Sequence, residues 1–306
     1  MHLASSRIVS LLLVAATGVL AACGGSDGKA PGWPEGALDG QGDSRVSWRA
    51  TERPWIIGHR GSGKQNGAQI FPENTIPALL QAIQVQGAIG VEFDVALTSD
   101  QQVVLMHDPH VDRTTECTGC ISEMTLEEAQ ACRTRDAAEE IFVPSLADAL
   151  AALAALPVRP LIMVDTKIGM DDCPIPADSA EEQETLLGRG VAEALVDAGV
   201  DDIAAVQAQG ATLLAELRQV TPRPITLFAK GGMDEALGVA EQHGFAGVAV
   251  GLERLEEGGI ERARDGGRLV DTFVVNAPVD LSFAVYYDVD VIETDDPTDL
   301  LESFRD

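Results

Sequence analysis

Positive charge is scarce in this chain of 306 residues. Lysine and arginine together number 21, against 49 aspartate and glutamate residues, and the formal net charge at pH 7 is -28. A surface this acidic repels nucleic acids and anionic lipid head groups at long range, which argues against either as a binding partner. A phosphate ester would need local positive charge, most simply a bound cation. The acidity also has a simpler interpretation, which is solubility.

A hydrophobic run of membrane-spanning length is missing at the N-terminus. The apolar run Ile8–Ala22 is short and rich in small residues, and it follows the positively charged start Met1–Arg7, which is typical of a secretory signal. Leu20-Ala21-Ala22-Cys23-Gly24 resembles the bacterial lipoprotein processing box. This resemblance implies that residues 1–22 are a signal peptide and that Cys23 carries a lipid. The alternative is an ordinary signal peptide with an incidental cysteine.

The next segment lacks apolar periodicity. Residues 24–47 are rich in Gly, Pro, Asp and Ser, so we interpret residues 23–50 as the lipidated cysteine with a flexible tether, and residues 51–306 as the folded domain. The lipoprotein resemblance implies an exported protein anchored to a membrane through lipid alone. Gly24 after the cysteine implies the outer membrane or its periplasmic face in a Gram-negative cell. In a Gram-positive cell the place would be the cell surface.

Cysteines are few, and four remain after Cys23: Cys117, Cys120, Cys132 and Cys173. An even number outside the cytoplasm indicates disulfides, for which three full pairings stay open. The Cys-x-x-Cys spacing of the first two is typical of half a zinc site. No second pair with zinc-ligand spacing follows, which argues against zinc.

Strand-like and helix-like segments alternate from Trp55 to the end. This alternation predicts a parallel sheet, and eight units favour a (β/α)8 barrel. An open doubly wound sheet is the alternative, but Gly61-Ser62-Gly63-Lys64 lacks the Gly-x-Gly-x-x-Gly pattern of its phosphate loop. The predicted strands are 55–59, 88–95, 161–165, 203–207, 225–228, 247–250, 272–276 and 289–293. The predicted helices are 75–86, 145–156, 180–198, 211–220, 233–243 and 252–264, with a last one after Pro297.

One segment breaks the alternation. Residues 95–107 hold two apolar runs with no room for a helix between them. We predict a hairpin that extends the second strand, turns near Ser99-Asp100 and returns over 103–106. Residues from about 109 to 140 then form an insertion that holds three of the four remaining cysteines.

Four polar clusters lie at the ends of predicted strands or on this hairpin. They are Gly58-His59-Arg60-Gly61, Glu92-Phe93-Asp94, His107-Asp108 and Asp165-Thr166-Lys167. In a barrel the carboxyl ends of the strands form the face where catalytic residues collect. We therefore expect these clusters to form one site.

Two acidic residues share one side of the second strand. Glu92 and Asp94 are two apart, so both carboxylates point the same way. Because burial and mutual repulsion disfavour two anions, a divalent ion would stabilise the pair, with Asp165 as a third ligand. All-oxygen ligands suit Mg²⁺, Ca²⁺ or Mn²⁺. The alternative is a structural ion pair with Arg60 or Lys167.

Two histidines, His59 and His107, lie in the same clusters. Histidine titrates near neutral pH, so such a pair can supply one general base and one general acid. His110 and His243 have no comparable neighbours and are expected on the surface.

The order of these motifs resembles the glycerophosphodiester phosphodiesterase family over about residues 54–303. Any one tripeptide is weak evidence, but five in the right order are specific. The matching segments are His59-Arg60-Gly61, Pro72-Glu73-Asn74-Thr75, Glu92-Phe93-Asp94-Val95, His107-Asp108 and Arg113-Thr114-Thr115, with later matches at Pro144-Ser145-Leu146, Val164-Asp165-Thr166-Lys167 and Thr294-Asp295-Asp296-Pro297.

The resemblance implies a barrel with a small insertion and a role for each matching residue. His59 and His107 would be the acid and base, with the order left open. Arg60 and Lys167 would contact the phosphate, with Glu73 and Asn276 as further substrate contacts. The metal ligands would be Glu92, Asp94 and Asp165. Asn74 is expected to cap the helix that begins at Thr75, rather than to enter the site.

Two departures from the family pattern matter. Asp165 stands where the family usually has glutamate, and its side chain is about 1.5 Å shorter, the length of one C–C bond. Asp-x-Lys at this place resembles the related sphingomyelinase D enzymes, which keeps a lysophospholipase D-like phosphodiesterase or lyase open. The second departure is the extra segment 62–71, which lengthens a loop over the site.

The expected function is therefore metal-dependent hydrolysis of glycerophosphodiesters to glycerol 3-phosphate and an alcohol. The partner would be this small-molecule substrate, with no nucleic acid, and the oligomeric state stays open. A non-catalytic surface lipoprotein that binds diesters is an alternative of a different class.

Overall fold

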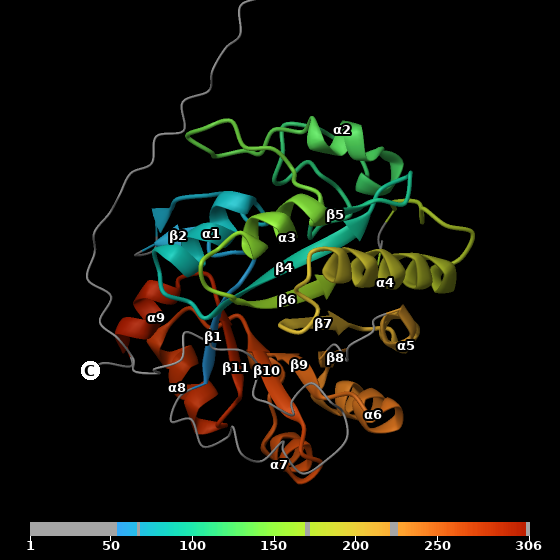
Figure 1. Cartoon of the computed structure of the whole chain (residues 1–306). Coiled ribbons are helices and arrows are strands. Elements are labelled where there is room, and N and C mark those ends of the chain that lie inside the picture. The colour runs from blue at the N-terminus through green and yellow to red at the C-terminus, as the bar shows by residue number, and fades with distance from the viewer. Residues whose placement is uncertain (1–53, 66–67, 169–171, 221–225, 304–306) are drawn as a thin grey trace, which may run out of the picture.

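Strands and helices alternate along the chain in the computed structural model, which describes residues 54–65, 68–168, 172–220 and 226–303 (Figure 1). The predicted signal peptide, the predicted lipid site Cys23 and the predicted tether lie outside these residues. Among the described residues no helix has the length and apolar composition to cross a membrane.

Eight parallel strands form a closed barrel. In the order of their pairing they are β1 (Trp55–Gly58), β4 (Gly90–Leu97), β6 (Leu161–Thr166), β7 (Ala204–Ala208), β8 (Thr226–Gly231), β9 (Gly247–Gly251), β10 (Leu269–Phe273) and β11 (Val291–Thr294). Strand β1 pairs in parallel with both β11 and β4, so the first and last strands of the barrel meet. The predicted (β/α)8 barrel is confirmed.

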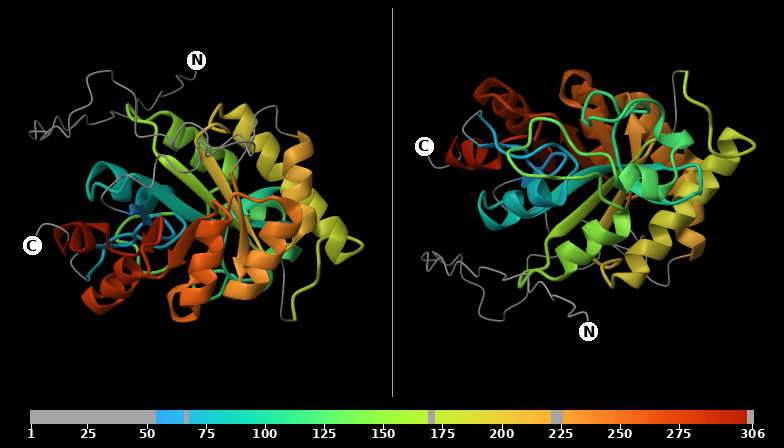
Figure 2. Two further views of the ribbon diagram at one scale, coloured as in Figure 1. Left: turned by 90° about the horizontal axis from the view of Figure 1, so that it is seen from below. Right: turned by 90° about the horizontal axis from the view of Figure 1, so that it is seen from above.

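Helices surround the strands of this barrel, as a ring in Figure 1 and from two further sides in Figure 2. They are α1 (Ile76–Gln84), α3 (Leu146–Ala154), α4 (Ala180–Asp197), α5 (Ala211–Val220), α6 (Met233–His243), α7 (Glu257–Asp265), α8 (Pro278–Tyr286) and α9 (Pro297–Ser303). The larger apolar core lies between these helices and the strands, and includes Val91 and Phe93 of β4. A smaller apolar cluster, with Ile57 and Phe228, fills the barrel interior below the polar strand ends.

Three expectations about the late elements are corrected. Strand β10 begins at Leu269, three residues before the predicted start, because Leu269 and Val270 already pair with Gly247 and Val248 of β9. The predicted helix 252–264 is split into a short 3₁₀ turn, η4 (Leu252–Arg254), and α7. Helix α8 was not predicted. Its exposed face carries several large apolar side chains, which hide the helical period: Val279, Phe283, Val285 and Tyr286.

The predicted hairpin and insertion are both present. Strand β5 (Val103–Leu105) returns antiparallel along β4. The insertion contains η3 (Ile121–Glu123) and α2 (Leu126–Gln130), around a small apolar cluster of its own. The short pair β2 (Lys64–Gln65) and β3 (Ala68–Gln69) lies in the lengthened loop after β1.

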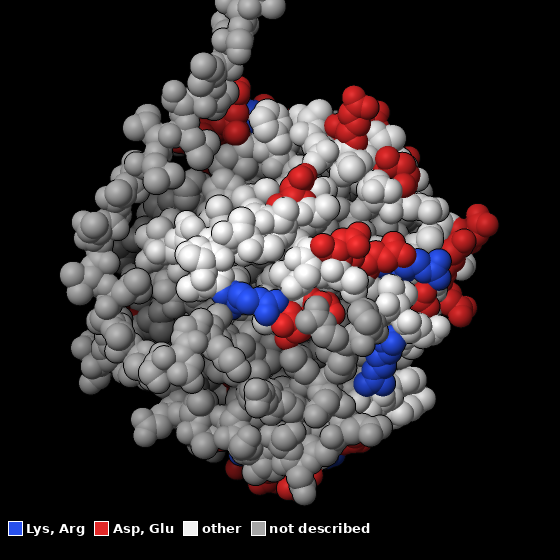
Figure 3. Space-filling model, in the orientation of Figure 1, with Lys and Arg blue, Asp and Glu red and all other residues white. Residues whose placement is uncertain are grey.

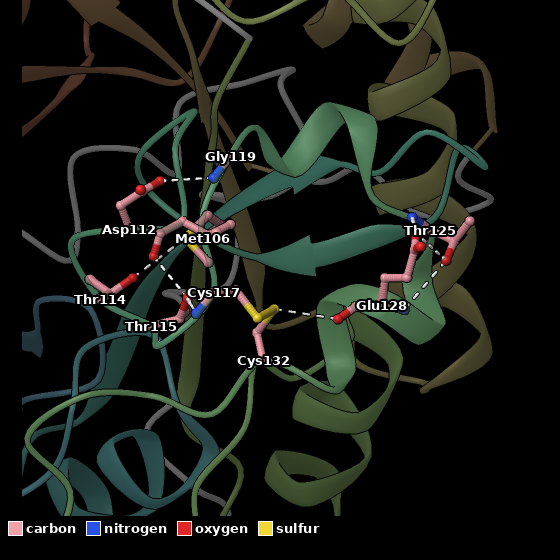
Figure 4. The surroundings of a disulfide bond; sticks show 10 residues. Met106, Asp112, Thr114, Thr115, Cys117, Gly119, Thr125, Glu128 and Cys132 are labelled. Carbon is pink, nitrogen blue, oxygen red and sulfur yellow. Dashed lines mark hydrogen bonds between the residues drawn. A yellow bond between two sulfur atoms is a disulfide. The ribbon is translucent and has the colours of Figure 1, made fainter.

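Two disulfides fix the insertion, and they resolve the three open pairings. Cys117 is bonded to Cys132 within the insertion, and Cys120 is bonded to Cys173 in the segment after β6. Figure 4 shows the first bond, with the Cys132 sulfur facing the Glu128 carbonyl oxygen of α2 at 3.4 Å. The second bond therefore ties the insertion to the barrel beside the strand ends.

Loss of the Cys120–Cys173 bond is expected to destabilise the protein more than loss of Cys117–Cys132. The bonded cysteines are 53 and 15 residues apart, respectively. Loop-closure entropy then gives about 4 kcal/mol for the longer loop and about 3 kcal/mol for the shorter one. Urea unfolding of the two double cysteine-to-alanine variants measures these losses. A larger loss for the shorter loop would contradict the expectation.

The surface reflects the acidic composition. On the face in Figure 3, Asp and Glu side chains gather over α2 and α4 with a few cations among them, while the surface over α3 is mostly uncharged. Two exposed cations of the chain are paired: Arg189 of α4 with Glu216, and Arg159 with Asp202. Such exposed pairs contribute little to stability.

Candidate active site

The four predicted polar clusters meet at the carboxyl ends of the barrel strands. His59 and Arg60 follow β1, and His107 follows β5, which pairs with the extended end of β4. Asp94 of β4 and Asp165 of β6 are register partners on neighbouring strands. The chain therefore brings together side chains that are more than 100 residues apart in sequence.

Three carboxylates form the centre of the site. Glu92, Asp94 and Asp165 are buried, and each offers an oxygen within 4.8 Å of those of the others. Alternation along β4 explains the arrangement, because Val91 and Phe93 point into the core under the helices while the acids point inward. The shorter Asp165 still reaches the group, so its departure from the family pattern leaves a three-oxygen set intact.

Cations surround two of these acids. The Lys167 ammonium lies 2.9 Å from an Asp94 oxygen and 2.5 Å from an Asp165 oxygen, and Arg60 Nε lies 3.3 Å from Asp94. Burial alone would raise the pKa of Asp94, but Lys167 and Arg60 outweigh it and hold that pKa well below its usual value. Asp94 is therefore an anion in this site.

The negative charge of Glu92 is less well compensated by nearby cations than that of Asp94. Its carboxylate accepts a hydrogen bond of 2.8 Å from the backbone N–H of Arg60. Burial, together with the charges of Asp94 and Glu293, raises the pKa of Glu92 well above its usual value. A hard divalent cation fits this environment, since it would supply the missing positive charge and prefers oxygen donors. The donor set alone does not distinguish Ca²⁺ from Mg²⁺ or Mn²⁺.

Each of the two histidines is bonded to an aspartate through Nδ1. His59 Nδ1 lies 2.8 Å from Asp295 Oδ1, and His107 Nδ1 lies 2.6 Å from Asp108 Oδ1. Such a bond fixes the ring orientation and directs Nε2 away from the aspartate. His110, by contrast, lies outside the site beside the Cys120–Cys173 bond. Its side chain is partly exposed and pairs with Asp172.

The two imidazoles have opposite electrostatic environments. Burial acts to lower the pKa of His59, but the bond to Asp295 and the nearby acids raise it overall. Burial also lowers the pKa of His107. The nearby Asp94 carboxylate raises this pKa in part, but burial and the Lys167 charge together keep it below the usual value. The two rings thus differ in proton affinity even though each has one aspartate partner.

A chain of ion pairs connects the two sides of the site. Glu73 accepts from Arg60 Nη1 at 2.8 Å and from both terminal nitrogens of Arg113, and Arg113 also pairs with Asp108. Glu73, which the sequence analysis predicted as a substrate contact, therefore positions Arg60 and the loop that carries His107. Direct contact between Glu73 and substrate stays a prediction.

The expected capping role of Asn74 is wrong. The cap residue of α1 is Thr75, and Asn74 adopts a positive φ of 55°. In that conformation its side chain donates to Asp94 Oδ2 at 2.8 Å and accepts from the Asp94 backbone N–H at 3.0 Å. Asn74 therefore orients one of the three central carboxylates.

Asn276 orients another residue of the site. Its amide group donates to Asp295 Oδ2 at 2.8 Å and accepts from the Asp295 N–H at 2.9 Å. Lys64 also pairs with Asp295 at 2.9 Å. The predicted contact between Asn276 and substrate stays untested, and its observed role is to hold the aspartate that bonds His59.

Several inward-facing residues were missed by the sequence analysis. Lys230 of β8 pairs with Asp165 and lies over the Phe273 ring at 4.4 Å. Gln207 Nε2 donates to Asp271 at 2.6 Å and to Glu293 at 2.7 Å inside the barrel. Burial raises the pKa of Asp271 to about 7. Every second residue of a barrel strand faces inward. This alternation could have predicted that Lys230 and Glu293 point into the barrel.

A cavity of about 230 Å³ opens beside the carboxylates, between the insertion and the ends of β6, β7 and β8. His107, Asp165, Lys167 and Lys230 line its inner end. The site therefore combines acidic side chains, imidazoles and cations next to an open cavity.

Comparison with known proteins gives the family. The model of the family described as "Glycerophosphoryl diester phosphodiesterase family" matches residues 59–299. A glycerophosphodiester phosphodiesterase of Caldanaerobacter subterraneus subsp. tengcongensis is 47% identical over 73 residues, which are 24% of this chain and 28% of that protein. Human glycerophosphodiester phosphodiesterase 1 is 41% identical over 106 residues, or 33% of this chain and 30% of that protein. The matches thus span less than a third of these relatives.

Solved structures agree on the fold. An Oleispira antarctica phosphodiesterase, solved with its product sn-glycerol-3-phosphate, has a TM-score of 0.70 at 21% identity and covers 83% of this chain and 97% of its own. A glycerophosphodiester phosphodiesterase of Agrobacterium tumefaciens has a TM-score of 0.61 at 22% identity, covering 80% and 98%. Since the family model matches residues 59–299, which include seven of the eight barrel strands and all five predicted motifs, this chain belongs to the glycerophosphoryl diester phosphodiesterase family.

Proposed function

We propose that this protein hydrolyses glycerophosphodiesters to glycerol 3-phosphate and an alcohol, with a divalent cation and the two histidines. The observation that carries the proposal is the convergence of His59 and His107 with the carboxylates of Glu92, Asp94 and Asp165 at one end of the barrel. The names of the relatives support the substrate class, and so does the product bound to the Oleispira antarctica enzyme.

Each residue of the site would have its own role in the reaction. Arg60 and Lys167 would hold the negatively charged phosphate, and the cation bound by the three acids would polarise its oxygens. One histidine accepts the proton of the glycerol hydroxyl next to the ester while that oxygen attacks phosphorus. The other histidine donates a proton to the oxygen of the leaving alcohol. Water then opens the cyclic phosphate, so one water molecule is consumed in each turnover.

A substrate panel tests this function directly. Metal-depleted protein is mixed with diesters such as glycerophosphoglycerol and glycerophosphocholine, and Ca²⁺, Mg²⁺ or Mn²⁺ is added back. Release of glycerol 3-phosphate is followed with its dehydrogenase. We expect release only when one of these ions is present. No release from any diester with any ion would disprove the proposed function.

A second candidate is the sphingomyelinase D-like or lysophospholipase D-like reaction, which Asp165-Thr166-Lys167 favours. In a lyase the cyclic phosphate is the final product, because water does not open it. Phosphorus NMR of the products from lysophospholipids distinguishes the two. A persistent cyclic phosphate supports the lyase, and a linear monoester alone supports hydrolysis.

We also propose that the protein is exported and anchored through a lipid on Cys23. The signal-like residues 1–22 support this, and so do the two disulfides, which form in oxidising compartments. Cell fractionation of the wild type and of a Cys23→Ala variant tests the anchor. Wild-type protein in the soluble fraction would contradict it.

A further inference from the structure

Lys230 reaches the active site from β8, a strand that carries none of the predicted site residues. Along β8, Ala229 packs in the core under the helices, while Phe228 belongs to the apolar cluster inside the barrel. Lys230 is two residues after Phe228, so it points inward at the polar end of the strand. Its ammonium pairs with Asp165 of β6, on the other side of β7, and lies 4.4 Å from the centre of the Phe273 ring.

The Lys230 ammonium is accessible from the cavity and has donors to spare. Its side chain is 16% exposed, and it lines the inner end of the cavity together with Lys167 and His107. An ammonium has three N–H donors. Among the described residues, Lys230 forms an ion pair with Asp165 alone, while Lys167 forms ion pairs with both Asp165 and Asp94. Lys230 can therefore donate to a ligand in the cavity without leaving Asp165.

Neutralising Asp165 does not by itself explain Lys230. Both lysines donate to the same oxygen, Asp165 Oδ2, although this carboxylate carries a single negative charge. Burying a second cation beside it is costly unless a further anion compensates the charge.

The charges of the whole cluster also favour an anionic ligand. Three carboxylates meet three cations here: Glu92, Asp94 and Asp165 with Arg60, Lys167 and Lys230. With a divalent cation bound to the acids, this group has an excess of positive charge. A phosphate ester at the inner end of the cavity would neutralise that excess.

We propose that Lys230 binds the substrate phosphate, as a third cation beside Arg60 and Lys167. It keeps its pair with Asp165 and donates a remaining N–H to a phosphate oxygen. There it also stabilises the charge that develops on the phosphate oxygens during the reaction. The inference rests on the proposed function, and it adds a substrate-binding residue from a strand outside the predicted motifs.

Lys230→Met tests the proposal through two affinities that are expected to change in opposite directions. Calorimetric titration of the metal-depleted variant with Ca²⁺, Mg²⁺ and Mn²⁺ is expected to give about 3- to 10-fold tighter binding, because a positive charge beside Asp165 is removed. A second titration uses glycerol 3-phosphate with the cation at saturation. This ligand is expected to bind about 10- to 100-fold more weakly, because a hydrogen bond between charged groups is lost.

Lys230→Arg and Arg189→Met are the controls. Lys230→Arg keeps a positive charge with several donors, so it is expected to restore most of the affinity for glycerol 3-phosphate. Arg189→Met removes a cation from an exposed ion pair with Glu216, outside the barrel, and is expected to leave both affinities unchanged. Thermal unfolding checks that each variant is folded. Loss of packing alone would not tighten one ligand while weakening the other.

Steady-state kinetics add a third measurement. In Lys230→Met, kcat/KM is expected to fall by a similar factor, about 10- to 100-fold, for glycerophosphoglycerol and for glycerophosphocholine, since the two diesters share the phosphate. A loss confined to one diester would contradict a phosphate contact.

The outcomes separate this proposal from the proposed function. An unchanged affinity of Lys230→Met for glycerol 3-phosphate would overturn the phosphate contact and leave Lys230 as a counter-ion of Asp165. A cation affinity that stays equal or falls would overturn the proposal as well. Absence of turnover of every diester by the wild type would instead disprove the proposed function, and the two titrations would still report on Lys230.

Discussion

Replacing either His59 or His107 by alanine is expected to lower kcat for glycerophosphodiester hydrolysis by about 100- to 10,000-fold, the usual contribution of a positioned acid or base. Each ring is held by an aspartate through Nδ1 at 2.8 or 2.6 Å, so each presents one nitrogen to the substrate in a fixed orientation. The loss should appear mainly in kcat, since the cations that would bind the phosphate stay in place. Stopped or coupled assays over a range of substrate concentrations measure kcat and KM separately.

His243→Ala is the matched control for these variants. His243 is the last residue of α6 and stacks on the Phe245 ring, with centroids 5.6 Å apart, away from the site. We expect its kcat to stay within about twofold of the wild type, because surface substitutions away from such features have small effects. If His59→Ala and His107→Ala both retained full activity, the acid–base mechanism would be wrong. A non-catalytic diester-binding role would remain only if the wild type also failed to turn over.

Asp94→Asn is expected to weaken the binding of a divalent cation by at least about 100-fold. Mutation of a residue that only supports a metal ligand typically lowers metal affinity by about 10- to 100-fold, and Asp94 would be a charged ligand itself. The Asp94 carboxylate is held by a hydrogen bond from Asn74 and by ion pairs with Lys167 and Arg60. Calorimetric titration of metal-depleted protein with Ca²⁺, Mg²⁺ and Mn²⁺ measures the affinity without any turnover. Asp234→Asn on α6, at an exposed ion pair with Arg262 of α7, is the control.

The same titration distinguishes a metal site from a structural ion-pair cluster. In a cluster held together by Lys167 and Arg60 alone, the wild type would bind no divalent cation with measurable affinity. Glu92→Gln adds a test in the absence of metal. Because the pKa of Glu92 is raised by burial and by neighbouring acids, removing its charge is expected to raise the unfolding temperature of the metal-depleted protein. A lower temperature would show that Glu92 is already well compensated.

The central residues of the site could be predicted from the sequence because they depend on strand periodicity and order alone. Glu92 and Asp94 are two apart on an apolar strand, so they had to share a face, and His59 and Asp165 lie at the ends of the two strands that flank β4. The closed barrel followed from eight alternating units. Asp165 was expected as a ligand despite its shorter side chain, and it lies within 4.8 Å of the other two acids.

Other features depend on tertiary contacts that leave no local pattern. Asn74 precedes a helix, as a capping residue would, but its left-handed backbone turns the amide toward Asp94. Asp271 was missed because the predicted start of β10 was three residues late. The prediction was centred on Phe273, Val274 and Val275, which have the composition of a strand. The disulfide pairing depends on where the insertion lies relative to the segment after β6, which brings Cys120 to Cys173. The spacing of the cysteines in the sequence does not specify this arrangement.

The Cys120–Cys173 bond joins the insertion to the segment after β6 directly beside the cavity. In a reducing compartment this bond would not form, and the insertion would no longer be covalently joined to the segment after β6. A newly made chain would therefore lack this tie, and the insertion would be fixed beside the cavity only once the chain is in an oxidising environment.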